Sequence, residues 1–350
     1  MILLFILVLI LLNIYLKKNH NKIDLFPIII VMLILYAGFK YNYSYDYNNY
    51  LIHFNEINSF ADVISTGFEK GYSLIIFIFK NLGLGFHALL LFIAFISIKT
   101  KSKLIKQLSI FPEISLLIYF LLFYVNNDVE QIRHGISIAF CFYSLIHMLK
   151  NNNKSKVYSF LLIVLGILFH TSAILFIPVL FIKDKKISKK TYIIIFLISL
   201  ALSYVNYFDL LTLLNNNFLH SLYLETKISL YARESNSLIN ASLLIKLFIL
   251  IVFYHFSFNS KDKSHRLLFN IYYLGIILSN VFNSIPILAI RGTIYMRYAE
   301  LLIIPLYIQT VINQRNKRYH YIILLLIFIY YFMKFFTLIT NPEYFYYTSI

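Results

Sequence analysis

The chain has 350 residues, of which 60% are hydrophobic and 13% charged, and its mean hydropathy is +0.75. These values exclude a soluble globular protein, in which about a quarter of the residues are charged, and they exclude a disordered chain. The single cysteine, Cys141, excludes a disulfide-rich domain and a multi-cysteine metal site. The sequence therefore predicts an all-α polytopic integral membrane protein, in which the net charge of +16 serves to set the topology.

Twelve apolar runs are candidate membrane crossings, although several are shorter than the ~20 residues that a full crossing needs. We expect about twelve hydrophobic helical segments (ten to thirteen), some of them short and partly re-entrant. The first run has no basic start and no cleavage site, which favours a retained helix over a signal peptide. In chain order the runs cover residues 1–16, 23–39, 84–98, 114–125, 135–149, 157–169, 171–182, 191–208, 240–258, 267–282, 298–312 and 319–338.

The basic residues between these runs predict the topology. Six clusters of Lys and Arg all fall on the same side of the membrane if the N-terminus lies outside, so the positive-inside rule predicts an N-out, C-out chain. The clusters are Lys17–Lys22, Lys99–Lys106, Lys150–Lys156, Lys183–Lys190, Lys261–Arg266 and Arg315–Arg318. The whole chain, residues 1–350, then forms one transmembrane domain without a soluble domain. Its outer loops cover about residues 40–83, 126–134, 209–239, 283–297 and 339–350.

Residues 157–182 are flanked by Lys clusters at both ends but are too few for two full crossings. We predict a pair of short helices that meet at His170-Thr171-Ser172 near the outer surface. Such a turn is tolerated at membrane depth only where it lines a wet or protein-filled cavity. The expected inner loops are short and contain no Gly-x-x-x-x-Gly-Lys sequence, which excludes a primary pump with its own nucleotide-binding domain.

A polar segment that opens the fifth run is the first candidate site. Gln131, Arg133 and His134 fall within one turn at the expected start of a helix. They can present donors to one anionic group there, and the helix macrodipole favours negative charge at that end. Arginine suits phosphate because its planar fork binds two oxygens. In the alternative, Arg133 pairs with Asp128 or Glu130 and only orients the helix.

Two more arginines lie at the expected outer start of a later helix. Arg291 and Arg297 add more positive charge at this place than the topology requires. We interpret both as ligands for a phosphate-type group. In the alternative, Arg297 forms an i,i+3 ion pair with Glu300.

The remaining candidates are a histidine and an acidic residue. His170 interrupts an apolar region, and its ordinary pKa near 6.5 suits it to accept a proton from a hydroxyl group; in the alternative it packs or caps the turn. Glu69 begins the sequence Glu69-Lys70-Gly71-Tyr72, before an apolar run too short to cross a membrane. We expect that run to be interfacial or re-entrant, and in the alternative Glu69 is an exposed acid paired with Lys70.

Four short motifs in a fixed order resemble the EpsG-type, Wzy-like family over about residues 40–345. They are Glu69-x-Gly71-Tyr72, Gln131-x-Arg133, Phe169-His170-x-Ser172-Ala173 and Arg297-Tyr298. Their order on a matching hydropathy profile makes the set more specific than any one motif. His134 departs from the pattern, because a second glutamine or a similar polar residue is more usual after Arg133.

The resemblance implies a polymerase of a bacterial surface polysaccharide: an O-antigen, a capsule or an exopolysaccharide. Such an enzyme is a metal-independent, GT-C-like membrane glycosyltransferase without a cofactor. It transfers the growing glycan from undecaprenyl diphosphate to a lipid-linked repeat unit at the outer face of the cytoplasmic (inner) membrane. The implied partners are the lipid-linked oligosaccharide, membrane lipid, a flippase and a chain-length regulator, and not nucleic acid.

The chemistry of a diphosphate leaving group assigns the candidate residues to roles. Negative charge develops on the diphosphate at the outer interface, and preorganised donors aimed at developing charge are commonly the largest catalytic term. We assign catalysis to His170, Glu69 and Arg133, with His170 or Glu69 as the base. We assign diphosphate and glycan binding to Arg133, Arg297, Arg291, Gln131, Tyr72 and Tyr298.

Other classes of membrane protein share this general sequence pattern. A lipid-linked oligosaccharide flippase or another transporter would place charged residues near the membrane midplane, whereas the charges here gather at the expected outer ends. An O-antigen ligase would carry a larger outer loop late in the chain. A membrane acyltransferase would place a catalytic histidine near the first helices, where the sequence has only His20 in a basic loop. A scaffold without activity has the same composition.

Overall fold

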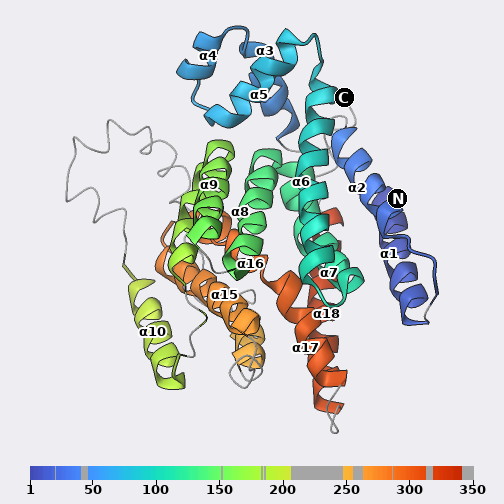
Figure 1. Ribbon diagram of the computed structural model, residues 1–350, viewed down its shortest axis with the longest axis vertical. Helices are drawn as coiled ribbons and strands as arrows, with labels where there is room; N and C mark the ends of the chain where they lie inside the picture. Colours follow the sequence, from blue (N-terminus) through green and yellow to red (C-terminus); the bar gives the residue numbers. More distant parts are fainter. Residues whose placement is uncertain are drawn as a thin grey trace. The chain divides into compact units, whose positions relative to one another are not determined.

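The computed structural model describes residues 1–19, 21–40, 46–150, 153–182, 184, 187–205, 247–254, 263–285, 287–312 and 318–340. Every element in these ranges is helical and none is a β-strand, which confirms the all-α prediction for the described part of the chain (Figure 1). The chain divides into two compact units. Unit 1 comprises Met1–Ala173 and Ile304–Ile350, and unit 2 comprises Ile174–Ile303.

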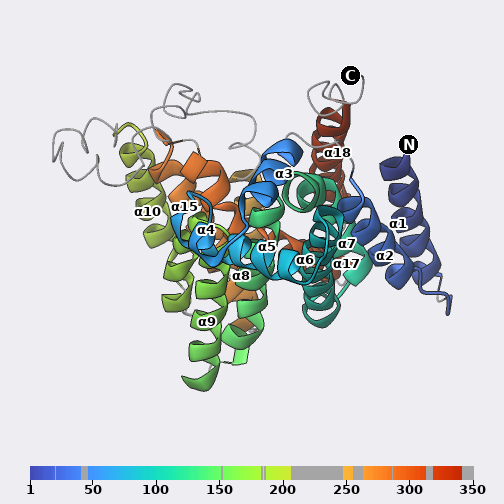
Figure 2. The same ribbon diagram turned by 90° about the horizontal axis from the view of Figure 1, so that it is seen from above.

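Unit 1 is built on a row of long helices in which α9, α8, α6, α2 and α1 pack successively side by side (Figures 1 and 2). The segment η1 packs against α8 and α18. The elements of unit 1 are α1 (Ile2–Lys18), α2 (Phe26–Gly38), α3 (Tyr47–Glu56), α4 (Phe60–Ser65), α5 (Lys70–Asn81), α6 (Phe86–Leu108), α7 (Pro112–Tyr119), η1 (Phe120–Glu130), α8 (Ile132–Lys150), α9 (Asn153–Phe169) and α18 (Arg318–Thr340). The 3₁₀ helix η2 (Thr171–Phe181) and α17 (Glu300–Ile312) connect the two units along the chain.

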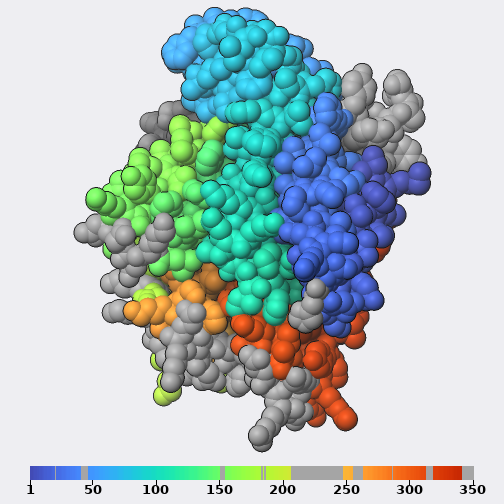
Figure 3. All heavy atoms as spheres, turned by 45° about the vertical axis from the view of Figure 1, so that its right-hand side comes forward, coloured from blue at the N-terminus to red at the C-terminus, as the bar shows by residue number. Residues whose placement is uncertain are grey.

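Three short helices, α3, α4 and α5, form a cap at one end of this row. Figure 3 shows the cap as a lobe on the end of α6, and α5 packs against α6 and α9. The side chain of Ser59 accepts from the Asp62 backbone N–H while the Asp62 carboxylate accepts from the Ser59 N–H, which starts α4 with a capping box. The apolar core of the cap continues into the long helices through Tyr72, Phe86 and Ile132.

The segment from α7 to α8 differs from the sequence-based expectation. Residues 126–134 were predicted to form an outer loop, but η1 continues as a π-helix to Glu130 and α8 begins at Ile132. Asn127, Asp128 and Val129 are at most 3% exposed, so the segment is part of the bundle interior. The polar residues of this segment suggested a loop because the partners of Asp128, namely Lys101 and Ser97 of α6, are distant in sequence.

Asp128 is neutralised inside unit 1 by a lysine of α6. The Nζ atom of Lys101 lies 2.8 Å from both carboxylate oxygens of Asp128, and both side chains are fully buried. The hydroxyl groups of Ser97 and Tyr119 also donate to this carboxylate, at 2.5 and 2.7 Å. The basic cluster Lys99–Lys106, expected in an inner loop, therefore lies within the last turns of α6.

Unit 2 contains α10 (Lys189–Leu202), α15 (Lys263–Val281), η3 (Leu288–Gly292) and α16 (Ile294–Arg297). Tyr192 joins α10 to α15, because its hydroxyl donates to Asn270 and its carbonyl accepts from the Tyr273 hydroxyl at 2.6 Å. Asn280 of α15 also donates to Ser199 of α10 at 3.0 Å. The predicted run 240–258 is described only for residues 247–254, which are helical.

Eleven of the twelve predicted runs lie largely on described helices, but the number of crossings is not thereby established. By length and composition, two described helical segments could cross a membrane, Ile132–Leu149 and Arg318–Thr340. The expected loop 209–239 and residues 341–350 lie outside the described residues.

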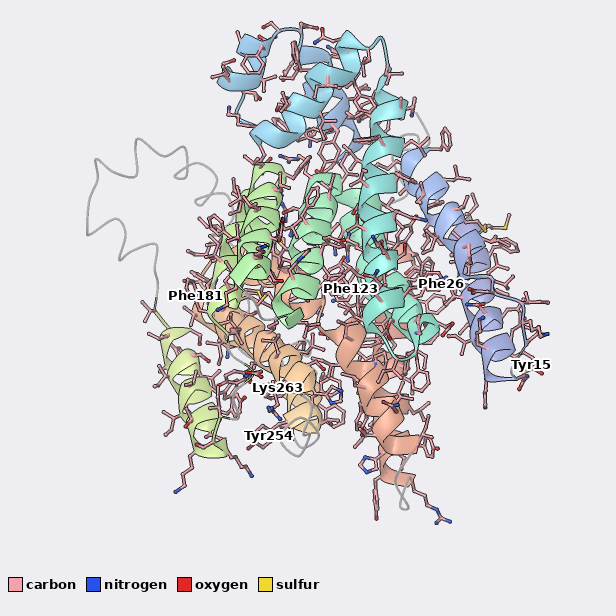
Figure 4. All side chains as sticks on the ribbon, viewed as in Figure 1. Tyr15, Phe26, Phe123, Phe181, Tyr254 and Lys263 are labelled. Carbon is pink, nitrogen blue, oxygen red and sulfur yellow. The ribbon has the colours of Figure 1, made fainter. Side chains whose placement is uncertain are left out.

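Large apolar side chains cover the outer faces of several helices. Figure 4 marks Tyr15 on the outside of α1, where it is 62% exposed, and Phe123 inside the bundle, where it is 1% exposed. Helix α18 likewise exposes Leu325, Leu326 and Met333. Monomeric soluble proteins rarely expose apolar surface of this extent, so the outer faces are consistent with a membrane protein.

Replacing Lys101 with Met should destabilise unit 1 by about 3–5 kcal/mol, because it leaves the Asp128 carboxylate buried without its countercharge. The measurement is thermal or denaturant unfolding of the purified protein in detergent. Lys106→Met is the matched control, since Lys106 pairs at 3.4 Å with Asp24 on the surface and exposed pairs contribute little. Similar losses in the two variants would contradict a special role for the buried pair.

Candidate functional site

Three candidate residues from three separate elements meet where the cap joins α8 and α9. Glu69 precedes the first residue of α5, Arg133 lies in the first turn of α8, and His170 follows the last residue of α9. The prediction that two helices meet at His170 is confirmed, because α9 ends at Phe169 and η2 begins at Thr171.

Arg133 and Glu69 form a direct ion pair between Nη1 and Oε2. The two side chains are 22% and 12% exposed, so the pair is largely shielded from water. The alternative pairs of Arg133 with Asp128 and of Glu69 with Lys70 are wrong about the partner. Asp128 binds Lys101 instead of Arg133, and Lys70 donates to backbone carbonyl groups at the end of α4 instead of pairing with Glu69.

Aromatic rings surround the Arg133 guanidinium. Its Cζ atom lies 4.5 Å from the centre of the Phe68 ring, 5.5 Å from that of Tyr50 and 6.0 Å from that of Tyr72. Such cation–π contacts hold a guanidinium through its face, and the Tyr50 side chain also forms a hydrogen bond with Arg133. The Arg133 Nε and the Tyr72 hydroxyl are both buried and have no hydrogen-bond partner among the described residues. Two donors at this site are therefore left for a ligand.

His170 and His134 face each other beside the ion pair. Their ring centres are 4.6 Å apart, with an angle of 33° between the ring planes. His134 Nδ1 donates to Oε1 of Gln131 at 3.1 Å, and His170 Nδ1 lies 2.6 Å from the Ser172 hydroxyl. Gln131 thus contacts the site through His134. His134, the residue that departs from the family pattern, is therefore the residue whose ring packs against His170.

Two glycines allow the backbones at the site to approach closely. A Cβ atom on Gly71 would lie 2.6 Å from the carbonyl oxygen of Leu168, so α5 rests directly on the end of α9. A Cβ atom on Gly135 would lie 2.2 Å from the carbonyl oxygen of Asn127, where η1 meets the first turn of α8. Any side chain at either position would separate these segments, so the two glycines bring Glu69 and Arg133 within reach of each other.

The environment of Glu69 keeps its carboxylate charged. Burial by itself raises the pKa of Glu69, but the positive charge of Arg133, the interaction with the His170 imidazole and hydrogen bonds from the Glu69 and Thr171 backbone N–H groups outweigh it. The net pKa is below the ordinary value. Glu69 therefore interacts both with Arg133 and with the turn at His170 and Thr171.

Sequence reasoning missed His53 of α3. Its ring stacks on Phe68 at 3.8 Å, and its Nε2 lies 2.9 Å from the Ser73 hydroxyl. Burial and the nearby charge of Arg133 lower the pKa of His53, which keeps the ring neutral. No motif marks His53 in the sequence. Its place in a polar stretch two helices before α5 is the only signal that could have found it.

The other three predicted residues belong to unit 2. Arg297 Nε lies 3.5 Å from Oε1 of Glu300, so the i,i+3 pair proposed as an alternative is present. Tyr298 is fully buried beside it, and Arg291 lies in η3. The structure therefore places Glu69, Tyr72, Gln131, Arg133 and His170 in one cluster of unit 1, and Arg291, Arg297 and Tyr298 close in sequence in unit 2.

The described residues contain no group of three or more His, Cys, Asp or Glu side chains that could hold a metal ion. The polar atoms of the cluster in unit 1 that have no partner among the described residues are donors, the Arg133 Nε and the Tyr72 hydroxyl. Donors of this kind bind phosphate and carboxylate oxygens.

A family model described as the EpsG family matches residues 23–349. The chain belongs to the EpsG family. No curated protein and no solved structure matches it. Membership of the EpsG family indicates a glycosyltransferase-like polymerase of polysaccharide biosynthesis, and together with the apolar helices it is consistent with a membrane protein.

Glu69 should stabilise the native state at neutral pH, because its pKa is lowered in the folded chain. This contribution is fully present above the ordinary pKa of a glutamate and is lost as the pH falls through the lower pKa of the folded state. Thermal unfolding of wild type and Glu69→Gln in detergent from pH 7 to pH 3 tests this. The wild type should be more stable at pH 7 and the difference should disappear in acid, so a difference that is independent of pH would refute the assignment.

Proposed function

We propose that the chain polymerises a bacterial surface polysaccharide by transferring a growing glycan from undecaprenyl diphosphate to a lipid-linked repeat unit. The observation that carries this proposal is the cluster of Arg133, Glu69 and His170 in a member of the EpsG family. It combines a group for the leaving diphosphate with a group that accepts a proton.

The reaction is a displacement at the anomeric carbon of the growing glycan. The hydroxyl oxygen of the acceptor sugar forms a bond to that carbon, while the bond from the carbon to the diphosphate oxygen breaks with inversion. The bonding electrons leave with the diphosphate, and the hydroxyl proton passes to a base. The guanidinium of Arg133 stabilises the charge that develops on the diphosphate, so the proposed chemistry needs neither metal nor cofactor.

His170 is the base in this proposal. A carboxylate whose pKa is lowered by an ion pair is a weak base, whereas an imidazole accepts protons near neutral pH. When Nδ1 of His170 donates to the Ser172 hydroxyl, Nε2 carries the lone pair that accepts the proton. His134, fixed by Gln131, supports the ring of His170 from one side.

We also propose that Arg291, Arg297 and Tyr298 of unit 2 bind diphosphate or glycan oxygens. The support is the shared chemistry of their side chains, a guanidinium pair and a phenol, which suits phosphate and sugar oxygens. The proposal places the chain in the bacterial cytoplasmic membrane with about twelve crossings, both termini outside and the site facing outward. A flippase and a chain-length regulator would act with it.

The buried pair of Lys101 and Asp128 bears on the transporter alternative, which expects charges in the bundle interior. Each partner is fully buried, and the carboxylate has four donor contacts from side chains. A charge pair that is fully buried and fully hydrogen-bonded has a structural role, and it does not favour transport.

A gene deletion complemented with wild type, Arg133→Ala or His170→Ala tests the function. The surface polysaccharide is examined as a size ladder on a gel. The deletion should leave single repeat units, and only wild type should restore the ladder. Arg318→Ala and His147→Ala are matched controls that should restore it, since Arg318 begins α18 and His147 lies in the last turn of α8, at the opposite end of that helix from Arg133. Loss of all surface sugar, with lipid-linked units retained inside, would favour a transporter.

Arg133→Lys should lower the rate of polymerisation by about 10²-fold, because an ammonium group keeps the charge but loses the two-pronged geometry for phosphate. The rate can be measured with purified lipid-linked repeat units and the protein in detergent. A variant that makes chains of normal length at a normal rate would show that Arg133 does not bind the leaving group.

A further inference from the structure

The guanidinium that the proposed function assigns to the diphosphate is already occupied by Glu69. We propose that Glu69 is an internal placeholder for a phosphate group: the lipid diphosphate displaces its carboxylate from Arg133, and the freed carboxylate then faces His170. This inference rests on the proposed function and deepens it. It couples binding of the diphosphate at Arg133 to activation of the base, His170.

The first argument is that Glu69 uses only part of the guanidinium. The ion pair engages Nη1 of Arg133, whereas Nε is buried without a partner among the described residues. A buried donor without an acceptor is unfavourable. A diphosphate presents more oxygens than a carboxylate, so it can satisfy Nε and Nη1 together.

The second argument is the Tyr72 hydroxyl. The Tyr72 side chain is fully buried, its hydroxyl group has no hydrogen-bond partner among the described residues, and its ring centre is 6.0 Å from the Arg133 Cζ atom. Buried hydroxyl groups in native proteins almost always have a partner. The Arg133 Nε and the Tyr72 hydroxyl, two buried donors without a partner among the described residues, therefore suit an anion that offers more oxygens than one carboxylate.

The third argument is that Glu69 loses little when it leaves Arg133. Its backbone is extended at the N-cap of α5, where its carbonyl oxygen accepts the first helical hydrogen bond from the Ser73 N–H, so the Glu69 side chain can turn without breaking that bond. Its carboxylate keeps the hydrogen bonds from the Glu69 and Thr171 backbone N–H groups. The diphosphate therefore has to replace one contact only, and the carboxylate is not left buried and unpaired.

Displacement also changes what Glu69 does for His170. While it is paired, its charge is shared with Arg133. Once the diphosphate neutralises Arg133, the charge of Glu69 is directed at His170 and stabilises the imidazolium that forms when His170 takes the acceptor proton, as the carboxylate of a catalytic triad does. Glu69 is a positioning residue in this account, because it acts through Arg133 and His170 and not on the sugar.

Binding of inorganic diphosphate to the full-length protein in detergent tests the proposal. Removing the carboxylate removes the competitor, so Glu69→Gln should bind diphosphate at least about tenfold more tightly than wild type. The same variant should polymerise more slowly. Tighter binding with slower turnover is a result that a merely structural role for Glu69 would not produce.

Glu56→Gln is the matched control, because it removes the same charge from the cap at a side chain that is 64% exposed. It should leave the affinity for diphosphate within about twofold, since long-range surface charge is screened by salt. Glu69→Asp, which keeps the charge on a shorter side chain, should give an intermediate affinity. If Glu69→Gln does not fold, the diphosphate affinity of Glu69→Asp tests the placeholder role in its place.

Arg133→Ala, alone and combined with Glu69→Gln, separates the two proposals. Wild-type binding that requires Arg133, together with no gain in Glu69→Gln and Glu69→Asp, would overturn the placeholder role and leave the proposed function standing. Binding that is unaffected by Arg133→Ala would overturn both. A gain in Glu69→Gln that survives Arg133→Ala, or that Glu56→Gln shares, would also overturn the placeholder role.

Discussion

Asp128 receives hydrogen bonds from three buried side chains, those of Lys101, Ser97 and Tyr119. Because an unpaired charge in such a place is strongly destabilising, the end of η1 cannot leave α6. The chain turns into α8 within four residues of this anchor, and Gly135 lets the turn lie directly on the Asn127 carbonyl. The position of Arg133, and hence the cluster that it organises, depends on a pair of charges in α6 and η1.

The elements that the sequence predicted well are those defined by local patterns. The apolar runs correspond to helices such as α2, α9 and α18, and the break at His170 lies where a polar residue interrupts an apolar region. Glu69, Arg133 and His170 were found as separate motifs, but nothing local shows that they meet. Their meeting depends on α5 crossing the end of α9, and this contact joins residues almost a hundred positions apart.

The errors have a common physical cause. Charged and amide side chains at residues 126–130 suggested a loop because their partners could not be seen, and Lys101 suggested an inner loop for the same reason. A buried polar group is acceptable when it is fully paired, and pairing across elements leaves no signal in hydropathy. His53 was missed for the related reason that stacking on Phe68 joins two residues without any periodic pattern.

The close backbone contacts at Gly71 and Gly135 have a consequence for how the chain can vary. Main-chain atoms of α5 and α9 approach closely at Gly71, and those of η1 and α8 at Gly135, so the positions of Glu69 and Arg133 depend on backbone contacts and not on the packing of large side chains. The surrounding Ile, Leu and Phe residues can therefore exchange for one another with little displacement of the cluster. Mutational tolerance should be high across the apolar faces and should fall sharply at two residues that carry no side chain.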